Sequence, residues 1–83
     1  MSEFELIAEI RHKSGIADPE GSTILRALPA LGFEEISNVS VGKAIRFAVS
    51  ASNASEAVAK GEELCKRLLA NPVLESFKVS VIS

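Results

Sequence analysis

The stretch ISNVSVGKAIRFAVSA, residues 36–51, decides which fold the chain can adopt. From Ile45 to Val49, apolar side chains stand at every second position, and this period of two predicts a strand with one buried face. Residues 36–41 predict a second, shorter strand. Gly42 and Lys43 separate the two, and glycine supplies the backbone freedom that a tight turn needs. The stretch therefore predicts a β-hairpin with Gly42 and Lys43 at its exposed tip.

Strands and helices alternate on both sides of this hairpin. Residues 4–10 and 77–81 show the same period of two, and helical spacing of apolar residues covers residues 19–31 and 54–70. The order β-α-β-β-α-β predicts an α+β, ferredoxin-like fold, a two-layer sandwich with a four-stranded antiparallel sheet and both helices on one face. A chain of 83 residues has room for one such domain, which we expect to span residues 1–83.

The first helix has clear start and stop signals. Asp18 can cap the first backbone N–H groups, and Pro19 suits the first helical position because its missing N–H would be unpaired there. Pro29 predicts a kink in the last turn, and Gly32 supplies the left-handed residue that follows many helices. A stripe of apolar residues is expected to face the core. Its members are Ile24, Leu28 and Leu31.

The second helix begins near Asn53, which precedes Glu56 by three residues and resembles a capping box. Asn71 and Pro72 end it, because the residue before proline avoids helical angles. We expect one face of this helix to pack on the sheet. The residues of that face are Ala57, Gly61, Leu64, Cys65 and Leu68.

A glycine at a helix entrance can also bind phosphate, because the first N–H groups are free. Here Asp18 would occupy that position, Pro19 removes one donor and Glu20 repels anions. Gly21 is the single glycine of the turn, without the Lys-Ser or Lys-Thr pair of a phosphate-binding loop. The motif therefore predicts a structural cap.

Catalytic side chains are few. His12 ends the first strand, but no serine, cysteine or acid is placed in sequence to act with it. Cys65 lies on the packed face of the second helix and predicts a buried thiol. One histidine and one cysteine are too few for a four-ligand metal site. We expect neither a catalytic residue nor a bound cofactor or metal on this chain.

Composition limits the partners. Nine basic and eleven acidic residues give a net charge of −2, and tryptophan and tyrosine are absent. A nucleic-acid binder normally carries a basic face and stacking aromatic residues, so we expect no nucleic acid. The N-terminus is acidic, and no apolar run approaches the roughly 18 residues of a membrane span. The sequence predicts a soluble, cytoplasmic protein.

The sheet face away from the helices mixes charged and apolar side chains. Such a face on a small domain predicts self-association, as a homodimer or a higher homo-oligomer, or docking to another subunit. The exposed lysine of the predicted hairpin could likewise meet a partner's carboxylate. The candidate partner or assembly contacts are Ile7, Arg11, Gly42, Lys43, Arg46 and Ile82.

Three motifs in this order and spacing resemble the PurS family, the small subunit of phosphoribosylformylglycinamidine (FGAM) synthase. The resemblance extends along nearly the whole chain. The motifs are the Asp-Pro-Glu-Gly entrance at residues 18–21, the Val-Gly-Lys stretch at residues 41–43 and the Leu-Ala-Asn-Pro exit at residues 69–72.

The resemblance implies a non-catalytic subunit of a complex in de novo purine synthesis. In that family, a PurL-type synthetase subunit holds ATP, Mg²⁺ and formylglycinamide ribonucleotide (FGAR), and a PurQ-type glutaminase subunit releases ammonia from glutamine. The small subunit dimerises and joins the other two. An ACT-like regulatory domain, which binds a small molecule, shares the strand order and is the alternative.

Overall fold

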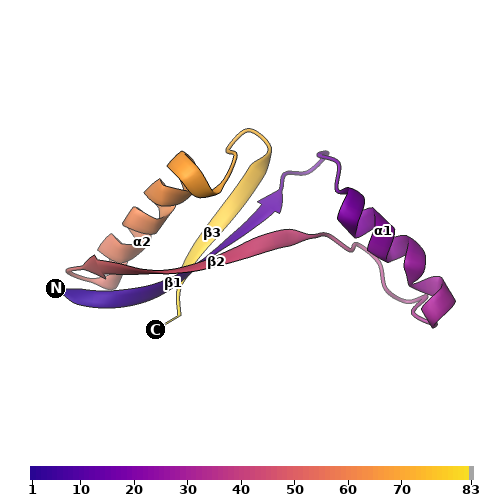
Figure 1. Ribbon diagram of the computed structural model, residues 1–83, viewed down its shortest axis with the longest axis horizontal. Helices are drawn as coiled ribbons and strands as arrows, with labels where there is room; N and C mark the ends of the chain where they lie inside the picture. Colours follow the sequence, from indigo (N-terminus) through magenta and orange to yellow (C-terminus); the bar gives the residue numbers. More distant parts are fainter. Residues whose placement is uncertain (83) are drawn as a thin grey trace.

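The computed structural model describes residues 1–82 and has three strands and two main helices (Figure 1). The strands form one antiparallel sheet in the order β2-β1-β3. The α+β class predicted from the sequence is confirmed. The elements are β1 (Ser2–His12), α1 (Pro19–Ala27), the 3₁₀ helix η1 (Pro29–Leu31), β2 (Gly42–Ala51), α2 (Ala54–Leu64), the π-helical segment η2 (Cys65–Leu69) and β3 (Glu75–Val81).

The core lies between the sheet and α2. The central strand β1 buries Leu6, Ala8 and Ile10, which alternate with exposed or half-buried residues as the period of two predicts. The helix approaches the sheet closely at Gly61. A Cβ atom there would lie 3.0 Å from Val79 Cγ1 and 3.1 Å from Leu6 Cδ1, so the absence of a side chain sets the distance between the layers.

The predicted hairpin is wrong. Residues 36–41 form no strand, and Gly42 and Lys43 begin β2 instead of standing at a tip. Two local features explain the difference. Asn38 has a left-handed backbone (φ 58°), which an extended strand cannot accommodate, and the N–H of Val41 donates to the Asp18 side chain. The sheet therefore has three strands and not the predicted four.

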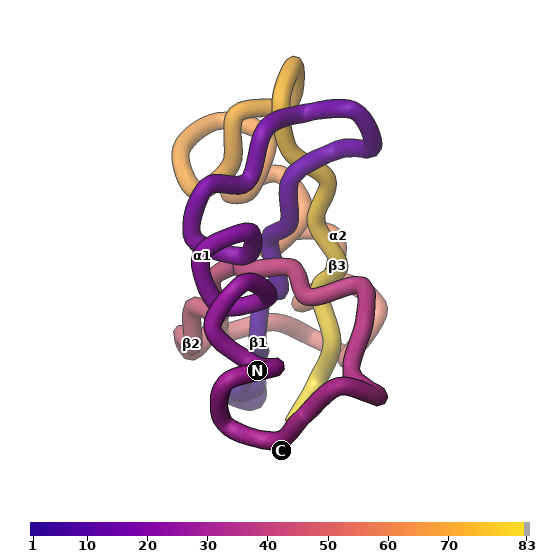
Figure 2. The backbone as a smooth tube through the Cα atoms, turned by 90° about the vertical axis from the view of Figure 1, so that its right-hand side faces the viewer, coloured from indigo at the N-terminus to yellow at the C-terminus, as the bar shows by residue number. Residues whose placement is uncertain are grey.

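The predicted position of the first helix is wrong as well. Helix α1 extends beyond the end of the sheet, and only α2 covers the sheet face (Figure 1). In Figure 2, viewed along the long axis, α1 lies in front of the strands. The molecule measures 52 × 27 × 14 Å, a long shape for a chain of this size.

The end of the first helix follows the sequence signals. The α-helix ends at Ala27, and the 3₁₀ helix η1 begins at Pro29. The disturbance expected at this proline is thus a change from α-helical to 3₁₀ geometry. Gly32 adopts the predicted left-handed conformation (φ 89°). The N–H of Phe33 donates to the carbonyl oxygen of Leu28 at 3.0 Å, which closes the helix end.

The second helix begins as predicted and ends before Asn71 as predicted, but its last turn is not α-helical. The Asn53 side chain accepts the N–H of Glu56 at 2.8 Å, which confirms the cap. From Cys65 the backbone widens into a π turn, closed by a 2.9 Å hydrogen bond from the N–H of Ala70 to the carbonyl of Cys65. This turn displaces Leu68 from the packed face, and its side chain is 74% exposed.

The close approach at Gly61 yields a stability prediction. Gly61→Val should lower the free energy of unfolding by about 1–3 kcal/mol, because the added atoms would overlap Leu6, Phe47 and Val79. Urea titration followed by circular dichroism measures the change. The control is Ala59→Val on the exposed side of the same helix, which changes helix propensity by roughly 0.6 kcal/mol. Equal losses in the two variants would contradict the packing argument.

Candidate assembly interface

The Asp18 carboxylate joins two distant segments. One oxygen, Oδ1, accepts the N–H of Gly21 at 3.0 Å and caps α1. The other, Oδ2, accepts the N–H of Val41 at 2.9 Å, on the residue that precedes β2. The predicted cap is confirmed, whereas no sequence pattern indicated the contact with Val41. This carboxylate fixes how the connection returns from α1 to the sheet.

These hydrogen bonds also govern the ionisation of Asp18. The backbone N–H of Val41 has the largest effect and lowers the pKa of the carboxyl group, with the N–H of Gly21 next. Both donors favour the charged form. The nearby His12 lowers the pKa further, while partial burial acts in the opposite direction. The carboxylate is therefore more acidic than an ordinary aspartate.

Gly21 makes this arrangement possible. A Cβ atom at this position would lie 2.5 Å from Asp18 Oδ2 and 2.9 Å from the carbonyl oxygen of Val39. Both distances are too short for a side chain, so the Asp-Pro-Glu-Gly motif brings α1 directly against residues 39–41. The site that a phosphate would need is filled by a carboxylate of the chain itself.

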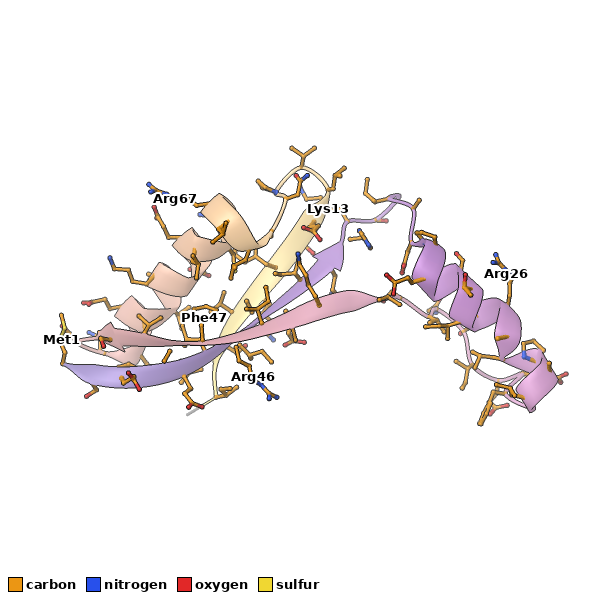
Figure 3. The ribbon with its side chains drawn as sticks, in the orientation of Figure 1. Met1, Lys13, Arg26, Arg46, Phe47 and Arg67 are labelled. Carbon is orange, nitrogen blue, oxygen red and sulfur yellow. The ribbon has the colours of Figure 1, made fainter. Side chains whose placement is uncertain are left out.

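The strand register places the predicted contact residues of the outer sheet face next to one another. Ile7 pairs with Arg46 on β2 and with Ser80 on β3, and Arg11 pairs with Gly42. Directly opposed residues share one face of a sheet. Figure 3 shows Arg46 directed away from α2 and Phe47 directed toward it. Ile82 joins this face, because its N–H donates to the carbonyl of Glu5 at 2.8 Å.

Lys43 does not belong to this outer face. It pairs with Ile10, whose side chain faces α2, so Lys43 lies on the opposite side of the sheet from Arg46. Gly42 is packed tightly, since a Cβ atom would lie 2.5 Å from the carbonyl oxygen of Ile10. The glycine is required by close strand packing and not by a turn.

The structure does not place His12 and Cys65 as a catalytic pair. His12 is exposed at the end of β1, where it pairs with Glu75. Cys65 is fully buried beneath α2, as predicted. Burial raises the pKa of this thiol, and the charge of Glu62 adds to the effect, so the reactive thiolate is disfavoured.

Apolar side chains line the outside of the first helix and its return, a region called here the α1 arm (residues 19–36). Leu31 is 68% exposed and Phe33 is 47% exposed. Of the stripe predicted to face a core, Ile24 and Leu31 are exposed and Leu28 is half-buried, so the rest of this chain covers the stripe only in part. Periodicity identified the stripe but could not identify what covers it. The arm's exposed large side chains are Ile24, Leu25, Leu31, Phe33 and Ile36.

Residues 1–82 contain no cluster of three histidine, cysteine or acidic side chains that could hold a metal ion. Over the same residues, no helix has the length and apolar character needed to span a membrane. The same residues expose two surfaces of the kind that other chains cover, namely the mixed outer sheet face and the apolar α1 arm. These are the features of a protein-interaction module.

Comparison with known proteins identifies the family. The family profile described as "PurS: Phosphoribosylformylglycinamidine (FGAM) synthase" matches residues 6–83. The chain is 41% identical over 70 residues to the phosphoribosylformylglycinamidine synthase subunit PurS of Archaeoglobus fulgidus, covering 84% of this chain and 88% of that protein. The corresponding subunit of Methanocaldococcus jannaschii is 40% identical over 72 residues, covering 87% of both chains.

Solved structures agree with the sequence comparison. The crystal structure of the PurS subunit of Thermotoga maritima superposes with a TM-score of 0.89 at 30% identity, covering 98% of this chain and 93% of that one. A chain in the structure of PurLQS from Thermotoga maritima gives a TM-score of 0.89 at 30% identity, covering 99% and 100%. This chain belongs to the PurS family of FGAM synthase subunits.

The carboxylate of Asp18 supplies a prediction about pH. Because its pKa is lowered in the folded chain, its stabilising effect is complete above the unfolded value of about 3.9 and is lost as pH falls through the folded value. Asp18→Asn keeps one acceptor oxygen, which can still cap the N–H of Gly21. The substitution should therefore accelerate hydrogen exchange at the Val41 amide near neutral pH, measured by NMR. The difference from the unchanged chain should shrink in acid.

Glu20→Gln is the matched control, because it removes a neighbouring exposed carboxylate from the same helical turn. It should leave exchange at Val41 nearly unchanged. Equal effects of the two substitutions would contradict a specific role for the Asp18 hydrogen bonds.

Proposed function

We propose that this chain is the non-catalytic bridging subunit of FGAM synthase, which converts FGAR, ATP and glutamine to FGAM in purine synthesis. The observation that carries the proposal is the likeness to a chain of PurLQS, which extends over 99% of this chain. The complex requires a subunit that joins a PurL-type synthetase to a PurQ-type glutaminase for ammonia transfer. A chain with two exposed contact surfaces, the α1 arm and the outer sheet face, suits that role.

The chemistry of the complex is assigned to the partners. ATP and Mg²⁺ bind in the synthetase subunit, and the small subunit contributes no cofactor ligand. The exposed His12 and the buried Cys65 support this division, because they lie on different elements and in opposite environments. We further propose that residues 1–83 act as one PurS-like domain in the cytoplasm, where purine synthesis takes place.

A second copy of the chain covers the α1 arm in this proposal. The arm carries exposed leucine, isoleucine and phenylalanine side chains. Full burial of one large apolar side chain is worth about 1.5–3 kcal/mol, and each of these side chains can contribute the part of that value that corresponds to its exposed surface. The outer sheet face, with Ile7, Arg11, Arg46 and Ile82, is the second proposed contact surface. Sheet order also leaves β2 at an edge, with backbone groups free to meet another chain.

Self-association through the arm can be tested directly. Leu31→Glu should weaken the dimer at least tenfold without unfolding the chain, because Leu31 is 68% exposed in the single chain. Sedimentation equilibrium measures the dissociation constant. Ser55→Glu places the same charge on the first turn of α2 and should leave the constant unchanged. A monomeric parent chain at micromolar concentration would refute self-association.

The non-catalytic role makes a kinetic prediction for the reconstituted complex. His12→Gln and Cys65→Ala should each lower turnover less than a few-fold, since loss of a general acid or base costs about 10²-fold or more. Ile82→Asp should instead raise the small-subunit concentration needed for half-maximal product formation. Glutamine-dependent FGAM synthesis is measured against small-subunit concentration. A collapse of the maximal rate with either His12 or Cys65 substituted would show that this chain is catalytic.

A further inference from the structure

The α1 arm is attached to the rest of the chain at its base alone (Figure 1). Across the described residues, α1 packs on η1 but has no extensive contact with any strand of the sheet. Two connections join the arm to the sheet: residues 13–18 lead out from β1, and residues 37–41 return to β2. The direction in which the arm points is therefore decided by these connections and by the bonds between them.

The return connection is fixed where it meets the sheet. Gly42 pairs with Arg11 on β1. Its backbone lies so close to the same strand that a Cβ atom would be 2.5 Å from the carbonyl oxygen of Ile10. Val41 directly precedes this anchored glycine. A group that holds the N–H of Val41 is thus held against the end of the sheet.

The outgoing connection is fixed at its first residue and free beyond it. The N–H of Lys13 donates to the carbonyl oxygen of Leu74 at 2.9 Å. Gly15 then adopts a left-handed backbone (φ 86°), and a Cβ atom there would have no other atom within 4 Å. One local hydrogen bond closes this turn, from the N–H of Ile16 to the carbonyl oxygen of Lys13 at 3.1 Å. Because glycine permits many backbone angles, the turn is a joint about which the arm can swing.

A single hydrogen bond spans this joint. Asp18 Oδ2 accepts the N–H of Val41 at 2.9 Å, and we call this bond the Asp18 clasp. Within residues 1–82, no other hydrogen bond links residues 14–36 to the strands or to residues 37–41. The acceptor is a carboxylate, so the bond is stronger than one between neutral groups. The clasp pins the start of α1 to the end of the sheet.

The length of the arm amplifies any movement at its base. From Asp18 to Leu31, a helical rise of about 1.5 Å per residue gives a lever of about 20 Å. A rotation of about 20° at the base therefore moves the far end by about 7 Å. This displacement exceeds the spacing of about 5–6 Å between neighbouring side chains on a helix surface. A partner that fits the arm in one direction would meet the wrong side chains after such a rotation.

We propose that the Asp18 clasp positions the α1 arm for self-association, by holding it in the direction in which a second copy of the chain binds it. This inference rests on the proposed function, in which a second copy covers the arm. Loss of the clasp removes no apolar contact but lowers the fraction of chains whose arm is ready to bind. Because both chains of a dimer need a correctly placed arm, a fall of this fraction to about one third weakens the dimer about tenfold.

Gly21→Ala breaks the clasp in a way that separates the position of the helix from its stability. The added Cβ atom would lie 2.5 Å from Asp18 Oδ2, the oxygen that holds Val41. Alanine nevertheless favours a helix more than glycine does. The matched control is Ser22→Ala, which also raises helix propensity but falls on the polar side of α1, away from Ile24. Circular dichroism checks that each variant keeps its helix content.

Two measurements are made on each variant. Double electron–electron resonance between spin labels at Arg26→Cys and Ala59→Cys reports the direction of the arm relative to α2. Both sites are exposed, and Figure 3 shows Arg26 on α1. The Leu31→Glu substitution is present in this measurement, so that no second copy holds the arm. The native Cys65 is buried and stays unlabelled. Sedimentation equilibrium of the unlabelled chains, without Leu31→Glu, measures the dissociation constant of the dimer.

We expect a narrow distance distribution for the parent chain and the Ser22→Ala control. Gly21→Ala should broaden the distribution and weaken the dimer at least tenfold. Asp18→Asn, which loses the bond to Val41 but keeps a cap, should act in the same direction. The inference is overturned by a narrow distribution in both clasp variants, by an equally broad one in the parent chain, or by an unchanged dissociation constant. The proposed function fails by a different result, namely that the unsubstituted chain does not support FGAM formation.

Discussion

The two hydrogen bonds accepted by the Asp18 carboxylate set the form of this molecule. One fixes the start of α1, and the other holds the N–H of Val41. A backbone N–H that is committed to a side chain cannot join a strand ladder. Residues 36–41 are consequently kept out of the sheet, and α1 is kept at the end of the long β1–β2 pair. Gly21 is the condition for this contact, because any side chain there would occupy the same space.

An exposed helix follows from that constraint. A ferredoxin-like chain that packed both helices on its sheet could bury its apolar residues without a partner. This chain leaves much of the apolar side of α1 exposed. The hydrophobic effect then favours an assembly over the separate chain. The small core beneath α2, with Leu6, Ala57 and Cys65 fully buried, keeps the sheet ordered while the arm remains available.

The contact surfaces of the molecule differ from one another in chemistry. The α1 arm is apolar, whereas the outer sheet face mixes Ile7 and Ile82 with arginine side chains. A subunit that joins unlike partners needs surfaces that differ in chemistry, because specificity arises from the difference between the right and the wrong partner. Reactive side chains are unnecessary to such a subunit, in keeping with a thiol buried under α2 and an imidazole at a strand end.

The sequence by itself determined the local elements. Alternation marked β1, β2 and β3, and the caps at Asp18, Asn53 and Gly32 marked the helix ends, because these signals act within a few residues. Tertiary structure alone decided that residues 36–41 stay outside the sheet, that α1 lies beyond the end of the sheet and that Leu68 is exposed. Each depends on a contact between distant residues or on a change of helical type, such as Asp18 with Val41 or the π turn at Cys65. Periodicity shows which face of an element is apolar, but the chain's long-range hydrogen bonds decide what, if anything, that face meets.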